Sequence, residues 1–286
     1  MKELNCVAIA GVGLIGGSLG LALGSRNLAR TIVGFGSRAA TLETAWRRGA
    51  ITEIAKDAKA AVAEADLVVL CAPVAHIAAL ARTINHFCRP GTLITDVGST
   101  KRDIVNELDA ALAEPSWNAL VRFVGSHPLA GNEKSGPEHA TADLFVGRTV
   151  VVTPTEHTQA EDLRAVVNFW QALGAKVREM SPDEHDRAVA ATSHLPHLVA
   201  AAIAGSTPEE YVSLTGSGWQ DTTRIAAGDP VLWRQIMLAN RGNLSALLEQ
   251  FSARLDEWRQ ALTAGDSVEL DRLLAEAKRI RDALGS

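Results

Sequence analysis

The sequence predicts an α/β protein in which a doubly wound Rossmann-type sheet is followed by an all-helical dimerisation domain. Over the first 180 residues short β-rich runs alternate with helical stretches, and from Ser181 onward only long helical patterns remain. The run Leu67-Val68-Val69-Leu70-Cys71 is apolar throughout, which is typical of a strand buried on both faces of a parallel sheet. Repeated βα units form right-handed crossovers, and a doubly wound fold follows from them.

Seven segments are expected to form strands, with helical patterns between most of them. The last one follows a helix that ends near Gly174 and is expected at the edge of the sheet. The strand candidates are residues 5–10, 31–35, 67–71, 93–96, 123–125, 149–153 and 176–180.

The helical part is expected to begin at Ser181, where Ser181-Pro182-Asp183-Glu184 combines an N-cap, a first-turn proline and a capping-box glutamate. Asp229-Pro230 and Asp266 indicate two further helix starts. We therefore predict a dinucleotide-binding domain over 1–180 and a helical substrate and dimerisation domain over 181–286. An apolar helical stripe favours a core or subunit interface over a cofactor site; it consists of Leu244, Leu247, Leu248, Phe251, Leu255, Trp258 and Leu262.

Composition excludes several classes of function. The chain has 286 residues, a net charge of −5 and no run of Lys or Arg, so nucleic acid is not an expected partner. Its three cysteines lack CxxC spacing, which fits a reducing compartment. Neither a signal peptide nor an unbroken apolar run of the roughly 20 residues that span a bilayer is found. We expect a cytoplasmic protein with no membrane association.

A dinucleotide fingerprint follows the first strand candidate. Gly11-Val12-Gly13-Leu14-Ile15-Gly16 lies between a strand and a helical pattern, the context that the GxGxxG motif requires. Gly13 allows the backbone to approach a pyrophosphate at the helix N-terminus. The alternative is a glycine-rich turn without a ligand. The expected cofactor contacts are Gly11, Gly13, Leu14, Ile15 and Gly16, with Cys71, Ala72 and Pro73 at the end of a later strand.

The second strand candidate bears on the choice of cofactor. It ends in Gly34-Phe35-Gly36-Ser37-Arg38, so the acidic residue that binds the ribose diol of NAD is missing. Ser37 and Arg38 can bind a 2′-phosphate instead. We predict that NADP is preferred and that NAD is possible; Arg38 stacking on adenine is the alternative.

Two residues after strand candidates are expected at the reacting end. Ser99 follows one strand and lies either in the crevice or at a helix N-cap. His127 precedes Pro128, which favours extended backbone at the histidine. An imidazole transfers protons near neutral pH, so a histidine beside a nicotinamide predicts a dehydrogenase. A structural histidine is the competing interpretation.

The helical part offers further candidates. His194 and His197 share a helix face with Pro196 between them, and either contact the substrate or form hydrogen bonds in the core. No acidic or cysteine partner has metal-ligand spacing, so no metal is expected. In the loop 216–224, Arg224 is expected either to clamp a carboxylate or to pair with a buried Asp221.

These segments resemble the prephenate/arogenate dehydrogenase family of tyrosine biosynthesis. The resemblance lies in Gly11–Gly16, Asp96–Lys101, Gly125–Gly136 (GSHPLAGNEKSG), Ser193–His197 (SHLPH), Asp221–Ala226 (DTTRIA) and Asp229–Arg234 (DPVLWR), which span nearly the whole chain.

The resemblance implies an oxidative decarboxylation of a cyclohexadienol. Hydride leaves C4 for the nicotinamide, CO₂ leaves C1, and the ring becomes aromatic. It further implies that His127 takes the proton of the 4-hydroxyl and that Ser99 orients the histidine and this hydroxyl. Arg224 is implied to bind a substrate carboxylate. His194 and His197 are implied to line the pocket, with Glu133 beside it.

The residues leave prephenate and arogenate open as substrates. Glu133 could attract the ammonium of arogenate, although Lys134 lies beside it, and relatives that use NADP often take arogenate. The alternatives are a β-hydroxyacid dehydrogenase or imine reductase, and a non-catalytic dinucleotide-binding module. The former is disfavoured because the only lysine beyond residue 180 is Lys278.

The chain ends just after its last helical pattern, so we expect no regulatory or mutase domain. Apolar helix faces predict a homodimer.

Overall fold

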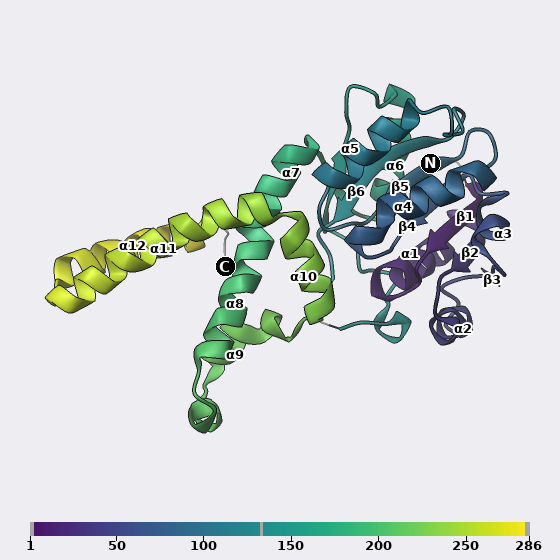
Figure 1. The fold of residues 1–286 in the computed structure, drawn as a ribbon. Helices are drawn as coiled ribbons and strands as arrows, with labels where there is room; N and C mark the ends of the chain where they lie inside the picture. Colours follow the sequence, from purple (N-terminus) through teal and green to yellow (C-terminus); the bar gives the residue numbers. More distant parts are fainter. Residues whose placement is uncertain (1–2, 132–133, 284–286) are drawn as a thin grey trace. The chain divides into compact units, whose positions relative to one another are not determined.

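The computed structural model describes residues 3–131 and 134–283 and contains an eight-stranded sheet (Figure 1). The strand order is β3-β2-β1-β4-β5-β6-β7-β8, and all neighbours are parallel except β6 and β7. The strands are β1 (Leu4–Ala10), β2 (Ala29–Phe35), β3 (Glu53–Ile54), β4 (Leu67–Leu70), β5 (Leu93–Asp96), β6 (Arg122–Pro128), β7 (Thr149–Thr153) and β8 (Lys176–Glu179). The predicted fold class and the edge position of the last strand are confirmed.

Two of these strands differ from the sequence-based expectation. The two-residue strand β3 was not predicted, because it is too short to show a pattern. Strand β6 extends through His127 to Pro128, where we expected it to end at residue 125. The extension pairs antiparallel with β7, opposite Val150 and Val151.

Alternate side chains of the strands enter two separate hydrophobic clusters. Ala8, Val68 and Ile94 belong to one cluster, whereas Val7, Leu67 and Val69 belong to the other. Because successive strand residues point to opposite faces, the sheet is covered on both sides. The covering helices are α1 (Leu14–Ser25), α2 (Ala39–Arg47), α3 (Ala58–Val62), α4 (Val74–Ile84), α5 (Arg102–Leu112) and α6 (Ala160–Ala172). The predicted burial of residues 67–71 on both faces is confirmed for Leu67–Leu70, whereas Cys71 follows the strand and is half-buried.

After the sheet the chain is helical. Helix α7 (Pro182–Val189) starts with the predicted capping box of Ser181 and Glu184. It continues through a π-helical turn at Ala190–His194 into α8 (Leu195–Ser206). Pro196 cannot donate a backbone hydrogen bond. It lies in the first turn of α8, just after the π-helical turn. Helices α9 (Ser217–Thr223) and α10 (Pro230–Ala239) follow, and Asp229 caps α10 as predicted.

The run 182–206 has the length and apolar composition of a membrane-spanning helix, with a mean hydropathy of 1.3 in its most apolar window. Core helices of globular proteins meet the same criterion. This run also carries the buried polar residues His185, Asp186, His194 and His197, so its apolar composition is weak evidence for a membrane.

The chain divides into two compact units, residues 1–240 and 241–286. The second unit is a helical hairpin of α11 (Arg241–Ala264) and α12 (Ser267–Asp282). Gly265 turns the chain with a φ of +63°, and Asp266 caps α12. Ion pairs of Arg254 with Glu276 and of Arg272 with Glu257 join the two helices. The predicted boundary near residue 180 stays a prediction.

Candidate active site

A cavity of about 950 Å³ lies at the carboxyl edge of the sheet, a volume in the usual range of ligand pockets. Strands β1, β2, β4 and β5 end there, and the residue that follows each of them lines the cavity. This is the edge at which open α/β sheets bind their ligands. All predicted cofactor residues line it, namely Gly11, Gly13, Leu14, Ile15, Gly16, Ser37, Arg38, Cys71, Ala72, Pro73 and Ser99.

The three glycines of the fingerprint, Gly11, Gly13 and Gly16, differ in why a residue without a side chain is found at each position. Gly11 has a φ of +90°, and a Cβ there would lie 2.4 Å from the carbonyl oxygen of Cys71. A Cβ on Gly16 would lie 2.0 Å from the carbonyl oxygen of Gly11. A Cβ on Gly13 would meet no atom of the described chain within 4 Å, although Gly13 lines the cavity. Packing therefore explains Gly11 and Gly16, and Gly13 leaves open space over the backbone.

That open space adjoins the start of helix α1. Gly13 is the N-cap, and no side chain caps the helix. The first N–H groups of a helix lack intrahelical partners and carry partial positive charge. A pyrophosphate fits this combination of open backbone and uncapped helix start, so the residues present suit a dinucleotide.

One end of the cavity is lined by Gly36, Ser37, Arg38 and Thr41, where no carboxylate follows β2. Lys56 lines the cavity too, as do Asp57 and His76. Asp57 is engaged as the cap of α3, since its carboxylate accepts from the N–H of Ala60 at 2.7 Å. Lys56, which motif reasoning missed, adds a second exposed cation to Arg38.

Ser99 lies half-buried in the cavity wall. Helix α5 begins only at Arg102, with Lys101 at the N-cap position. The predicted alternative, in which Ser99 caps this helix, is therefore wrong. The helix start is instead satisfied by Asp186, whose carboxylate accepts from the backbone N–H groups of Lys101 at 2.7 Å and Arg102 at 3.1 Å.

His127 is the penultimate residue of β6, which lies beside β5 in parallel register. Thr95 of β5 is opposite Val124 of β6, and His127 lies three residues further along β6. The residues after β6, Ala130 and Gly131, line the cavity. His127 itself is half-buried and is not among the residues that line the cavity.

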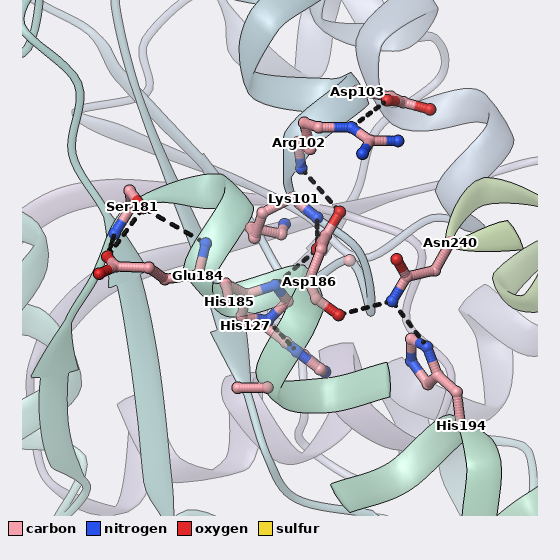
Figure 2. A network of polar contacts seen from close by, with 12 residues as sticks. Lys101, Arg102, Asp103, His127, Ser181, Glu184, His185, Asp186, His194 and Asn240 are labelled. Carbon is pink, nitrogen blue, oxygen red and sulfur yellow. Dashed lines mark hydrogen bonds and ion pairs between the residues drawn. The ribbon is translucent and has the colours of Figure 1, made fainter. Parts of the chain in front are cut away.

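A chain of hydrogen bonds runs inward from His127 (Figure 2). Its Nδ1 lies 2.8 Å from Nε2 of His185, and Nδ1 of His185 lies 2.7 Å from a carboxylate oxygen of Asp186. Both His185 and Asp186 are buried on α7. Nε2 of His127 forms no hydrogen bond to any described residue.

The surroundings keep His127 neutral at pH 7. Burial is the main cause that lowers its pKa well below the ordinary 6.5, and the nearby His185 and Lys101 lower it further. Lys101 is fully buried, forms an ion pair with the equally buried Asp96, and donates to the carbonyl oxygen of Ser126 at 3.0 Å. A neutral imidazole is the form that accepts a proton.

Burial also lowers the pKa of His185. For Asp186 burial raises the pKa, but hydrogen bonds from His185 and from two backbone N–H groups outweigh it, so the net pKa is lowered. At neutral pH the hydrogen-bonded series therefore consists of the ionised carboxylate of Asp186 and the neutral imidazoles of His185 and His127.

His194 and His197 are both buried on the same helical run. Nδ1 of His194 lies 3.1 Å from the side-chain nitrogen of Asn240, which also donates to the carbonyl oxygen of Asp186 at 2.7 Å. Burial lowers the pKa of His194 to about 4. His194 therefore has the hydrogen bond in the core that one of the two predicted alternatives describes.

The ring of His197 stacks on Trp233 of α10 with centroids 3.4 Å apart. Its Nδ1 is buried without a hydrogen-bond partner among the described residues. A buried polar atom without a partner is uncommon in native structures. His197 is therefore the better candidate of the two for a contact with a bound molecule.

Asp221 and Arg224 are both exposed, on α9 and on the 3₁₀ segment Arg224–Ala227. The prediction of a buried Asp221 is wrong, and among the described residues Asp221 makes no ion pair. Arg224 lies in the segment that leads to Gly228, where an added Cβ would be 3.2 Å from the ring of His197. Glu133 lies outside the described residues. Among those that are described, no group of His, Cys, Asp and Glu suits a metal ion.

Comparison with known proteins bears directly on this site. One family model, the nucleotide-binding domain of prephenate dehydrogenase, matches residues 19–179, and the dimerization domain of the same enzyme matches residues 181–276. The chain belongs to the prephenate dehydrogenase family. The predicted resemblance is thereby confirmed.

Individual relatives cover almost all of this prephenate dehydrogenase family member. It is 32% identical to cyclohexadienyl dehydrogenase of Zymomonas mobilis over 99% of this chain and 97% of that protein. It is 33% identical to prephenate dehydrogenase of Bacillus subtilis over 98% of this chain and 76% of that protein. The crystal structure of A. aeolicus prephenate dehydrogenase in complex with hydroxyphenyl propionate and NAD+ superimposes with a TM-score of 0.89 at 33% identity, covering 99% of both chains.

Proposed function

We propose that this protein oxidises prephenate or arogenate with loss of CO₂ and hydride transfer to a nicotinamide cofactor, in tyrosine biosynthesis. The observation that carries the proposal is the placement of His127. It is neutral, lies three residues before Ala130, which lines a cavity that suits a dinucleotide, and has one ring nitrogen without a partner among the described residues. Membership of the prephenate dehydrogenase family supports the same substrate class.

In the reaction, Nε2 of His127 accepts the proton of the substrate's 4-hydroxyl as the C4–H bond breaks and a C4 carbonyl forms. The cofactor, when bound, supplies the acceptor for the hydride. The electron pair of the C1–carboxylate bond then moves into the ring as CO₂ leaves, and His127 returns its proton to the resulting phenolate oxygen. Ser99 orients the hydroxyl and the imidazole from the neighbouring strand end.

The substrate's carboxylate is assigned to Arg224. A guanidinium binds a carboxylate through two parallel hydrogen bonds. The buried Nδ1 of His197 offers a further polar contact. Asp221, His194 and Glu133 stay predicted pocket residues, and the core hydrogen bond of His194 gives it a positioning role.

A steady-state assay with prephenate and arogenate tests the proposal. We expect reduced cofactor and CO₂ to form in equal amounts with at least one of the two substrates. Cofactor binding without turnover would favour the non-catalytic module, and turnover of a β-hydroxyacid alone would favour the other enzyme class. His127→Asn is the matched control, since it keeps the cavity and removes the base.

We infer that NADP is the preferred cofactor. The support is the absence of an acidic residue at Gly36 and the presence of Ser37, Arg38 and Lys56 along the same cavity. In the doubly substituted Arg38→Ala, Lys56→Ala variant we expect kcat/KM for NADP to fall by roughly 10-fold or more, the loss of about 1.4 kcal/mol or more, with little change for NAD. Arg47→Ala on α2 is the control cation. A strong preference of the unmodified enzyme for NAD would contradict the inference.

We also infer a homodimer formed through the helical part, with the functional boundary near residue 180. Large apolar side chains exposed there support it, among them Leu214, Leu238, Leu255, Leu262, Leu274 and Ile280. The family's dimerization domain matches this region. A cytoplasmic location is supported by three cysteines that are all free. Sedimentation of the purified protein tests the dimer, and a monomer at micromolar concentration would contradict it.

A further inference from the structure

The hydrogen-bond chain behind His127 specifies where the protons lie. The backbone N–H groups of Lys101 and Arg102 both donate to the carboxylate of Asp186, which is therefore ionised and can only accept. The ring nitrogen of His185 that faces this carboxylate, Nδ1, must carry a hydrogen. Since burial keeps His185 neutral, its Nε2 is a bare acceptor.

The same reasoning extends one step outward. His127 presents Nδ1 to the bare Nε2 of His185 at 2.8 Å, so this Nδ1 must be the donor. In a neutral imidazole only one nitrogen carries a hydrogen. Nε2 of His127 is then left with a free lone pair, and no described residue forms a hydrogen bond with it.

We propose that His185 and Asp186 are positioning residues that hold His127 in the tautomer whose Nε2 accepts the substrate's proton. The importance of that tautomer for turnover depends on the proposed function. The tautomer itself does not, since it follows from the hydrogen-bond chain. Neither residue was assigned a role from the sequence, because their contacts lie 58 and 85 positions away in the chain.

Asp186 also fixes the second predicted catalytic segment. Its carboxylate accepts from the N–H groups of Lys101 and Arg102, which lie two and three residues after Ser99, at the N-cap and the first residue of α5. Asn240 in turn donates to the carbonyl oxygen of Asp186 at 2.7 Å. A single carboxylate therefore sets the orientation of His127 through His185 and anchors the loop that carries Ser99 (Figure 2).

Substitutions at position 185 separate this role from packing. His185→Leu has similar size but provides no acceptor for His127. His185→Gln restores both contacts in principle, because its amide oxygen can accept from His127 while its amide nitrogen donates to Asp186. Long-range ¹H–¹⁵N spectra of protein labelled in its histidine rings report the tautomer directly, with the His127 signals assigned by their loss in His127→Asn.

We expect His127 to carry its hydrogen on Nδ1 in the unmodified protein and in His185→Gln, and to change to the Nε2–H form or a mixture in His185→Leu. We expect kcat to fall by about 10–10²-fold in the leucine variant and to recover in the glutamine variant, with KM for the cofactor unchanged. A hydrogen on Nε2 of His127 in the unmodified protein would overturn the proposal. So would an unchanged tautomer in a folded leucine variant.

The two readouts also distinguish this inference from the proposed function. If the tautomer changes as expected while turnover of prephenate and arogenate is unaffected, the positioning role stands and the proposed chemistry of His127 fails.

Discussion

The two ends of the active site differ in the parts of the protein that form them. At the cofactor end, short-range backbone geometry forms the site: three glycines within six residues and the uncapped start of α1. At the reacting end, side chains of β6 and α7, the side chain of Asn240 and a backbone N–H group at the start of α5 form one hydrogen-bonded chain. The first arrangement suits the pyrophosphate that dinucleotide cofactors share, and the second one is proposed to fix the protonation of His127.

This difference predicts how each end tolerates change. A backbone site loses binding when its open space is filled, but its hydrogen-bond donors cannot be removed by substitution. A side-chain network loses chemistry when any member is replaced, because the remaining buried polar groups are left without partners. Substitutions in the polar network at the reacting end should therefore act on kcat and stability, and those that fill the open space at the cofactor end on KM.

The largest effect is expected at the base itself. His127→Asn should lower kcat by on the order of 10²–10⁴, since the general base is removed, with little change in the KM for the cofactor. Single-turnover measurement of reduced cofactor gives the effect on the chemical step. Near-normal turnover would remove His127 from the mechanism.

The pH profile provides a second measure of the same residue. His127 must be neutral to act, and its pKa is held well below 6.5, so kcat/KM should stay high at pH 6.5 and fall only at lower pH. This acid limb should be absent from the residual activity of His127→Asn. A limb centred above 6.5 would contradict the assignment.

The next largest effect is expected for Arg224→Ala, because this substitution removes a group that binds the substrate's carboxylate. The expected rise in KM corresponds to about 2–5 kcal/mol, with a smaller effect on kcat. Arg178→Ala, an exposed cation on the edge strand β8, is the matched control. An unchanged KM in Arg224→Ala would return this arginine to a structural role.

The contrast between local backbone geometry and long-range side-chain contacts also decides how much of each end of the active site the sequence predicts. The cofactor loop was predictable residue by residue, because Gly11–Gly16 is a local motif and each strand end lies next to its own loop. Ser99 and His127 were predictable as strand-end residues, although the helix cap at α5 was not, since its partner Asp186 is 84 positions from Arg102. The polar chain through His185 could not be read from spacing. A signal existed in the unusual density of histidines on one helix.

The exposed position of Asp221 was also beyond the sequence. Residues 216–224 were expected to form a loop, but Ser217–Thr223 form helix α9. A Gly-Trp-rich segment with an acidic and a basic residue looks the same whether it packs inward or outward. Tertiary contacts alone decide which. Lys56 was missed because it follows β3, a strand too short to be predicted.

The polar network at the reacting end should also make stability depend on pH. His194 has a pKa of about 4 in the folded state and about 6.5 when unfolded. Between these values the unfolded chain binds more protons, so stability is complete above pH 6.5 and falls as the pH drops toward 4. This single group should cost about 3 kcal/mol in total. Urea unfolding at several pH values measures it.

His194→Asn keeps an acceptor for Asn240 and cannot be protonated, so it should flatten this part of the pH dependence. His157→Asn, at an exposed loop position, should leave it unchanged. If His194→Asn shows the same slope as the unmodified protein, the buried neutral state of His194 is wrong.

The smallest effect is expected at the cofactor loop, and it separates packing from ligand binding within a single motif. Gly13→Ala adds a Cβ that meets no atom of the described chain, so thermal stability should stay the same while the KM for the cofactor rises by roughly 10-fold, the loss of about 1.4 kcal/mol. Gly11→Ala instead forces a residue with a side chain to a φ of +90° against the carbonyl oxygen of Cys71, and should lower stability by about 1–3 kcal/mol. Calorimetry with and without cofactor distinguishes the two. Equal destabilisation by both substitutions would mean that the space over Gly13 belongs to the packing of the protein, and that the cofactor end is no more tolerant than the network around His127.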